Sequence, residues 1–361
     1  MKPTLDTSIS PEPSPATRIL GALLGGAVGD ALGAPVEFFS LDEIRRRHGP
    51  SGVTGFEKAF GRKGAITDDT QMSLFTAEGL ILSRVRQDDA DAGLAATAIY
   101  HAYLRWLYTQ DTARQAQLIR QHGTCAVIDG MLTTHAGLFA WRAPGQTCLS
   151  ALRSGRMGTI AQPINASKGC GGVMRVAPVG FACADVSAAF QLGCASAAIT
   201  HGHPTGYLSA GFMAVLIASI AGGARLPEAV DAARRILATH AGHEESSHAV
   251  AAAVALSRRG DPTPATMETL GAGWVADEAL AMGLYAALVA GRDFRRGVLL
   301  AVNHSGDSDS TGAIAGSIIG ACYGADVIPS DWLAELELRA VITEVAADLA
   351  DTFHPIVKKG D

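Results

Sequence analysis

The chain has 361 residues and a net charge of −6, and 48% of its residues are hydrophobic while only 6% are aromatic. It contains no run of lysine and arginine longer than the three arginines at 45–47, which argues against the clustered basic surface that nucleic-acid binding needs. The six cysteines show no C-x-x-C spacing, which favours reduced thiols in a cytoplasmic protein over a disulfide framework. A chain of this length buries a substantial core. Because no Pro/Gly/Ser-rich linker divides it, we expect one helical domain over residues 16–355.

Residues 1–15 carry four prolines among serine and threonine, a composition that predicts a flexible tail. Structure should begin near Ala16, where apolar residues start to fall at helical spacing. Gly33 and Pro35 end this first helix. Glu37 follows directly after it.

Two turns rich in oxygen-bearing side chains open helices that lie far apart in the sequence. The first turn consists of Thr67, Asp68 and Asp69. The second turn contains Asp307, Asp309 and Ser310. Asp, Ser and Thr are the preferred N-caps, so each turn alone is typical of a helix cap. A cap needs one such side chain, however, and each turn offers three. Because oxygen ligands select Mg²⁺, Mn²⁺ or Ca²⁺, we expect a hard-cation site if the fold joins the two turns.

Helical spacing recurs through most of the chain. The remaining predicted helices cover about 67–81, 89–108, 111–121, 185–199, 205–221, 226–239, 244–258, 275–290, 310–322 and 331–352. Alternating strand patterns are scarce, so we predict an all-α fold. The most apolar stretch, 206–222, is interrupted by two serines and predicts a buried core helix rather than a membrane span. Residues 123–180 are rich in Gly, Pro and Thr and predict short helices and long loops, where ligand contacts tend to lie.

Five sequence blocks occur in a fixed order. They are GALLGGAVGDALGAPVEF at 21–38, TDDT at 67–70, NASKGCGGVMR at 165–175, TH at 200–201 and GDSDS at 306–310. In this order they resemble the ADP-ribosylglycohydrolases, from about Ile19 to Tyr323. The resemblance implies an all-α orthogonal bundle with two Mg²⁺ or Mn²⁺ ions in a central cleft. It also implies hydrolysis of the glycosidic bond between ADP-ribose and an acceptor.

The resemblance implies two ion sites that share one ligand. The ligands of the first ion match Thr67, Asp68, Asp69 and Asp309. The ligands of the second match Asp307, Asp309 and Ser310, with serine where the family usually has threonine. A serine hydroxyl offers the same oxygen, so Asp309 is expected to bridge the two ions.

Two further acids belong to the same blocks. Glu37 matches a family acid assigned either to metal ligation or to activation of water, and its alternative is a solvated acid after a helix. We expect Glu37 or Asp69 to activate the water. Asp30 is more typical of a helix-end acid that holds a loop than of a catalyst.

The glycine-rich block and a histidine complete the implied site. Closely spaced glycines let the backbone approach a ribose or a diphosphate. Ser167, Gly169 and Cys170 are therefore candidates for ADP-ribose contact, with an ordinary turn before the core segment 173–174 as the alternative. His201 matches a family histidine that lines the substrate cleft, although a lone histidine before a helix is typical of a hydrogen-bonded cap.

Three remaining features bear on the same site. His203 matches no family position and is expected to be a cap. Residues 271–276 (GAGWVA) resemble a family segment near the adenosine end; the alternative is a loop anchored by a buried Trp274. Some members carry a further Asp where residues 142–149 here read RAPGQTCL. That Asp is absent, which leaves proton handling to Glu37 or to an acid of the metal cluster.

We therefore expect a metal-dependent hydrolase that removes ADP-ribose from modified proteins. Arginine is the favoured acceptor, because a guanidinium is already cationic as it leaves. An alternative is an immunity protein that neutralises a partner ADP-ribosyltransferase toxin by direct binding through the cleft and the tail. A third is a metal-dependent hydrolase of other small nucleotides or guanidines. Neither a nucleic-acid partner nor a membrane is expected.

Overall fold

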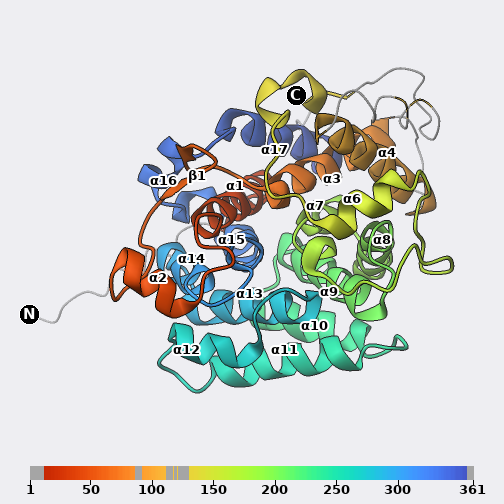
Figure 1. The fold of residues 1–361 in the computed structure, drawn as a ribbon. Coiled ribbons are helices and arrows are strands. Elements are labelled where there is room, and N and C mark those ends of the chain that lie inside the picture. Colours follow the sequence, from red (N-terminus) through yellow and green to blue (C-terminus); the bar gives the residue numbers. More distant parts are fainter. Residues whose placement is uncertain (1–11, 86–91, 111–116, 118–119, 121–129, 356–361) are drawn as a thin grey trace, which may run out of the picture.

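The computed structural model describes residues 12–85, 92–110, 117, 120 and 130–355, and these ranges are almost entirely helical (Figure 1). The helices are α1 (Pro15–Gly33), α2 (Leu41–His48), α3 (Asp68–Val85), α4 (Ala92–Gln110), α6 (Gln146–Arg153), α7 (Ala177–Ala182), α8 (Val186–Ala198), α9 (Pro204–Ala221), α10 (Leu226–Leu237), α11 (Glu244–Ser257), α12 (Pro264–Met267), α13 (Ala276–Ala290), α14 (Phe294–Val302), α15 (Ser308–Tyr323), α16 (Ser330–Glu335) and α17 (Arg339–Phe353). In the described ranges, the only paired strands are β1 (Lys58–Ala59) and β2 (Arg62–Lys63), which form a short antiparallel hairpin. The all-α prediction is confirmed.

Helices α1 and α15 lie side by side at the centre of the molecule (Figure 1). Glycine recurs at every fourth position of both helices, and each glycine of one faces the backbone of the other. A Cβ added at Gly25 would lie 2.4 Å from the Gly316 carbonyl oxygen, and one at Gly29 would lie 1.9 Å from that of Gly312. The two backbones therefore pack at a distance that only glycine allows. Since the helices run antiparallel, the end of α1 meets the start of α15, where Asp307 and Asp309 stand.

Helix α9 is the predicted apolar core helix. Of the described helices it is the one long and apolar enough to cross a membrane by length and composition, but 78% of that window is buried inside the molecule. It packs against α8, α10 and α7, and its side chains belong to the main hydrophobic core. The prediction of a core helix is confirmed.

Most predicted helices match observed ones within a few residues, but one predicted helix is wrong and three observed helices, α2, α12 and α14, were not predicted. The single helix predicted over 331–352 is wrong: α16 and α17 are separate, because Leu338 adopts a left-handed conformation with φ of 54°. Helix α2 was missed because only Leu41 and Ile44 of its eight residues are buried, too few to form a period. Helix α14 was also missed. The predicted helix 111–121 and most of the tail lie outside the described residues.

Candidate active site

Carboxylates from three distant segments converge on one cavity of about 480 Å³. Glu37 reaches it from the turn after α1, and Asp68 and Asp69 from the first turn of α3. Asp307 and Asp309 reach it from the start of α15. The first and second Asp-rich turns thus meet in one place, as expected for a hard-cation site.

Glu37, Asp307 and Asp309 form the tightest group. One carboxylate oxygen of each lies within 4.8 Å of the other two. Two unit charges about 4 Å apart repel by about 4 kcal/mol at an effective dielectric constant near 20. Burial, and then the charges of Asp309 and Asp307, raise the pKa of Glu37 to about 10. The three carboxylates can stay close together only if some are protonated or if a cation binds between them. A divalent cation replaces their mutual repulsion with attraction to the ion.

The remaining acids lie in the same electrostatic field. Burial raises the pKa of Asp69 well above its ordinary value, and the charge of Asp309 raises it further. The Oδ2 atom of Asp69 is buried and has no hydrogen-bond partner. Asp68 Oδ2 accepts a hydrogen bond of 3.2 Å from the backbone nitrogen of Gly145. An unpartnered carboxylate oxygen in an all-oxygen donor set fits Mg²⁺ or Mn²⁺.

Two predicted ligands carry hydroxyl groups. Ser310 lines the cavity, and its backbone nitrogen donates to Asp309 Oδ1 at 3.0 Å. Thr67 is fully buried behind the cavity wall, where its hydroxyl accepts a 3.2 Å hydrogen bond from the backbone nitrogen of Asp69. Burial raises the pKa of Asp309 above its ordinary value, and hydrogen bonds, among them one with the Thr67 side chain, partly offset that rise. The ligand role of Thr67 stays a prediction.

Asp30 holds the first turn from behind. Its carboxylate accepts hydrogen bonds from the backbone nitrogens of Thr67, at 2.9 Å, and Thr70, at 3.2 Å. It also accepts one from the Thr70 hydroxyl. Asp30 is completely buried and is not part of the cavity wall. The prediction that this acid holds a loop is confirmed.

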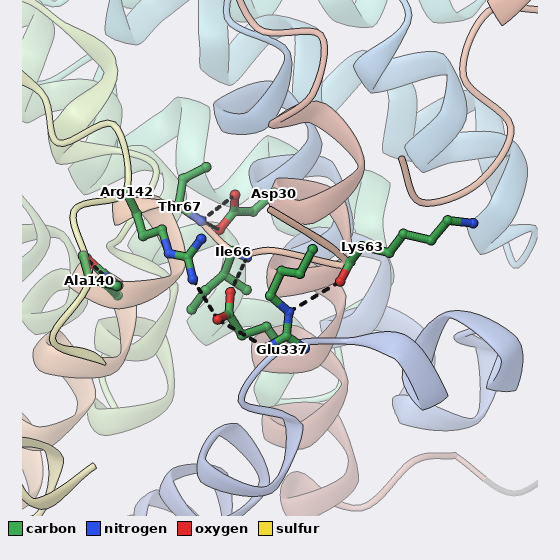
Figure 2. Close-up of polar contacts among 9 residues, drawn as sticks. Asp30, Lys63, Ile66, Thr67, Ala140, Arg142 and Glu337 are labelled. Atoms are coloured by element: carbon green, nitrogen blue, oxygen red, sulfur yellow. Dashed lines mark hydrogen bonds and ion pairs between the residues drawn. The ribbon is translucent and has the colours of Figure 1, made fainter. Parts of the chain in front are cut away.

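Glu337 holds the same turn from the other side, at the break between α16 and α17 (Figure 2). Its carboxylate accepts a 3.1 Å hydrogen bond from the backbone nitrogen of Ile66 and forms a 2.7 Å ion pair with Arg142. The carbonyl oxygen of Arg142 in turn accepts from the backbone nitrogen of Asp68 at 3.0 Å. No sequence pattern predicted this contact, because Glu337 lies inside the continuous helix expected over residues 331–352.

The glycine-rich loop lies directly against the acids. Gly169 and Cys170 line the cavity, and the Cys170 thiol lies 2.8 Å from Asp307 Oδ2. The Ser167 hydroxyl accepts a 3.2 Å hydrogen bond from the backbone nitrogen of Gly169, so it braces the loop from within and does not line the cavity. Gly169 and Cys170 therefore lie at the cavity, and their contact with ADP-ribose stays a prediction.

The two histidines after α8 have separate positions. His203 is the N-cap of α9, since its Nδ1 accepts from the backbone nitrogen of Thr205 at 3.2 Å. His201 lines the cavity, and its Nδ1 lies 2.8 Å from the Thr200 hydroxyl. The prediction that His201 lines the cleft agrees with this position, and the cap interpretation holds only for His203.

Three aromatic side chains lie exposed at the cavity, and no sequence pattern predicted this exposure. Phe38, Trp141 and Trp274 line it with exposed fractions of 71%, 52% and 39%. Phe38 and Trp274 stack with ring centroids 5.1 Å apart. The alternative of a buried Trp274 anchor is therefore wrong. Single aromatics in loops have no periodicity that a sequence pattern could detect.

The segment that lacks the additional family Asp also lines the cavity. Residues 143–148 contribute to its wall and contain no acid. This segment contacts Asp68 through the backbone nitrogen of Gly145, which donates a hydrogen bond to the carboxylate. The expectation that proton handling falls on other acids is consistent with this wall.

Comparisons with known proteins show which family the chain is similar to. The family model for ADP-ribosylglycohydrolase matches residues 11–356. The ADP-ribosyl-[dinitrogen reductase] glycohydrolase of Rhodospirillum rubrum is 29% identical over 332 residues, which are 91% of this chain and 92% of that protein. The ADP-ribosylarginine hydrolase Tri1 of Pseudomonas putida is 27% identical, over 92% of this chain and 78% of that protein.

A solved structure described as an "ADP-ribosylglycohydrolase-related protein complex" superposes with a TM-score of 0.63 at 27% sequence identity. The match covers 94% of this chain and 99% of that one. The family model spans nearly the whole chain, including both Asp-rich turns, the glycine-rich loop and Glu37. The chain therefore belongs to the ADP-ribosylglycohydrolase family, enzymes that hydrolyse ADP-ribose linkages.

Proposed function

We propose that this protein is a metal-dependent cytoplasmic hydrolase that removes ADP-ribose from modified arginine side chains of proteins. The observation that carries the proposal is the convergence of Glu37 and both Asp-rich turns on one cavity. The names of the relatives that act on ADP-ribosylated dinitrogen reductase and on ADP-ribosylarginine support the choice of substrate.

The acids of the cavity would hold two ions. The first ion would be held by Thr67, Asp68, Asp69 and Asp309. The second would be held by Asp307, Asp309 and Ser310. Bound Mg²⁺ or Mn²⁺ supplies Lewis-acid polarisation of water and of ribose hydroxyls. The unpartnered Asp69 Oδ2 and the crowding of Glu37, Asp307 and Asp309 support this assignment.

Cleavage of a glycosidic bond passes through an oxocarbenium-like ribose, which a water molecule attacks. A carboxylate must accept a proton from that water, and Glu37 and Asp69 are the two candidates at the cavity wall. The guanidine leaves with the bonding electron pair, and because the guanidinium of the substrate is already cationic it needs little help from an acid. The wall formed by residues 143–148, which offers no acid, suits this leaving group.

The test uses two substrates in parallel, a protein ADP-ribosylated on arginine and a peptide ADP-ribosylated on serine. We expect release of free ADP-ribose from the arginine substrate with Mg²⁺ or Mn²⁺, and none after chelation. Asp309→Asn should be inactive. Asp331→Asn is the matched control, because that acid pairs with Arg295 on the surface. Turnover of only the serine substrate, or full activity in chelator with the metal shown to be removed, would overturn the proposal.

The same variant tests the immunity alternative. The exposed Phe38, Trp141 and Trp274 at the cavity offer a surface that a toxin could contact. If inactive Asp309→Asn still blocks an ADP-ribosyltransferase in stoichiometric amounts, direct binding is supported. If it does not, protection requires hydrolysis.

A further inference from the structure

A buried guanidinium stands directly behind the cleft histidine. Arg175 is completely buried, and its Nη2 donates a 2.7 Å hydrogen bond to the Thr200 hydroxyl. Its guanidinium lies over the Tyr103 ring at 4.2 Å, and its Nη1 lies 3.3 Å from Cys148 Sγ. Among the described residues, no carboxylate forms an ion pair with Arg175. The same Nη2 also donates to the Ser196 carbonyl oxygen at 3.4 Å, so the Thr200 hydroxyl is its shorter hydrogen bond.

The direction of the next hydrogen bond follows from the donors available. Arginine has only donors, so the Thr200 oxygen must act as acceptor toward Arg175. The single hydroxyl proton of Thr200 is then free to point at His201 Nδ1, 2.8 Å away. Polarisation by the cation strengthens that hydroxyl as a donor. An Nδ1 that accepts leaves the ring proton on Nε2.

The Nε2 edge of His201 faces the glycine-rich loop at the cavity wall. A Cβ at Gly169 would lie 3.3 Å from Nε2, and one at Gly171 would lie 2.8 Å from Cε1. No described residue forms a hydrogen bond with Nε2, although the side chain is only 2% exposed. Burial and the charge of Arg175 also lower the pKa of His201 to about 3, so the ring is neutral.

We propose that Arg175 and Thr200 are positioning residues that fix His201 as a neutral imidazole with its Nε2–H directed into the cleft. This donor serves an oxygen of bound ADP-ribose, on its diphosphate or its ribose. The identity of that ligand rests on the proposed function, whereas the tautomer does not. Because Gly169 and Gly171 have no side chains, they leave space for a ligand to approach the Nε2 edge of the His201 ring.

The tautomer can be read directly from the full chain labelled with ¹⁵N-histidine. Long-range ¹H–¹⁵N correlation distinguishes a protonated from an unprotonated ring nitrogen, and loss of the signal in His201→Gln assigns it. We expect, at pH 7 and without ligand, a protonated Nε2 and an unprotonated Nδ1. A protonated Nδ1, or a cationic ring, would overturn the proposal. This readout is independent of any hydrolysis.

Variants of Thr200 test whether its hydroxyl fixes the tautomer of His201. Thr200→Val removes the hydroxyl at nearly constant shape, and we expect His201 to lose its single tautomer and the affinity for ADP-ribose, measured by calorimetry, to fall about 10-fold. Thr200→Ser should restore both. Thr109→Val is the matched control, because it deletes a buried hydroxyl that bonds to the Trp106 carbonyl on α4.

The outcomes distinguish a failure of the Arg175–Thr200–His201 proposal from a failure of the proposed function. An unchanged His201 tautomer in folded Thr200→Val would overturn the role of Thr200, and an altered tautomer with unchanged ADP-ribose affinity would overturn the donor role. If the parent protein binds no ADP-ribose, the proposed function fails while the spectrum still decides the tautomer. Should Thr200→Val not fold, the parent spectrum alone confirms or rejects the assignment.

Discussion

Asp309 is the acid that the other acids of the cleft share. After burial, its charge is the largest cause that raises the pKa of Glu37, of Asp69 and of Asp307. A group in that position is placed to bridge two ions.

Asp309→Ala should therefore lose more bound metal than Asp307→Ala. A bridging carboxylate serves both ions, whereas Asp307 serves one, so the first change removes a ligand from each site. Elemental analysis after dialysis against Mn²⁺ measures the content directly. The bridging role is rejected if Asp309→Ala retains as much metal as the parent protein.

At the scale of the residue, the sequence predicted the side chains that can bind a metal ion, but not the contacts that hold those side chains in place. The two Asp-rich turns carry more oxygen ligands than caps require, which is visible without a structure. Their convergence came from the family resemblance, since nothing in the spacing of residues 240 positions apart predicts it. The supporting contacts of Glu337, Arg175 and Thr200 could not be predicted, because they depend on which buried donors meet which acceptors.

At the scale of the element, the glycine-mediated contact of α1 and α15 positions both halves of the site. The change Gly29→Ala tests this contact, because helix propensity and the close packing of the two backbones predict opposite changes in stability. In a free helix this change stabilises by about 1 kcal/mol, but here the new Cβ would lie 1.9 Å from the Gly312 carbonyl oxygen. We expect a net loss of about 2 kcal/mol in the free energy of unfolding, measured in urea, together with weaker metal binding.

Gly55→Ala is the control for that change. A Cβ there meets only the Trp332 ring at 3.8 Å, an ordinary contact. It should shift the free energy of unfolding by less than about 0.5 kcal/mol. A stabilised Gly29→Ala protein would show that the helices separate without cost.

The break between α16 and α17 supports a second prediction at this scale. Glu337→Gln removes the charge that pairs with Arg142 but keeps an acceptor for the Ile66 nitrogen. Loss of one partner of a buried ion pair costs about 3–5 kcal/mol. Because the Arg142 carbonyl holds Asp68, we expect Mn²⁺ affinity to fall as well as the melting temperature. A lower melting temperature with unchanged Mn²⁺ affinity would limit Glu337 to stability.

Helix periodicity predicted the long elements better than the junctions between them. Helices such as α9 and α15 are rich in apolar and small residues, and their patterns run to within a few residues of the observed ends. The break at Leu338 is set by a tertiary contact, since the chain turns there so that Glu337 reaches two loops. Local propensity contains no information about such a contact.

At the scale of the whole molecule, metal binding and folding should be coupled. The acids repel one another in the metal-free protein, and a ligand at 100 times its dissociation constant stabilises the folded state by about 2.7 kcal/mol. Mg²⁺ or Mn²⁺ should therefore raise the melting temperature, and a chelator should reverse the rise. An unchanged melting temperature after demonstrated removal of metal would contradict this coupling.

The size of that stabilisation should grow with pH. Burial, followed by the charge of Asp309, raises the pKa of Asp30 to about 7, and burial with the neighbouring acids raises that of Glu37 to about 10, above ordinary values of 3.8 and 4.5. The folded protein thus binds more protons than the unfolded chain, so these acids lower the stability of the metal-free protein as pH rises, Asp30 from about 4 through 7 and Glu37 from about 4.5 through 10. Bound metal removes the part of that penalty that comes from the acids of the cavity, because it pairs with their charged forms.

The measurement is the difference in the free energy of unfolding between Mg²⁺ and chelator, at pH 5 and at pH 8. His201 contributes the opposite slope below pH 6.5, because its pKa is lowered to about 3, but it does so with and without metal and cancels in the difference. We expect the metal-dependent difference to be larger at pH 8. A difference that is equal at both values, or larger at pH 5, would mean that the clustered acids are not the groups that the metal pairs with.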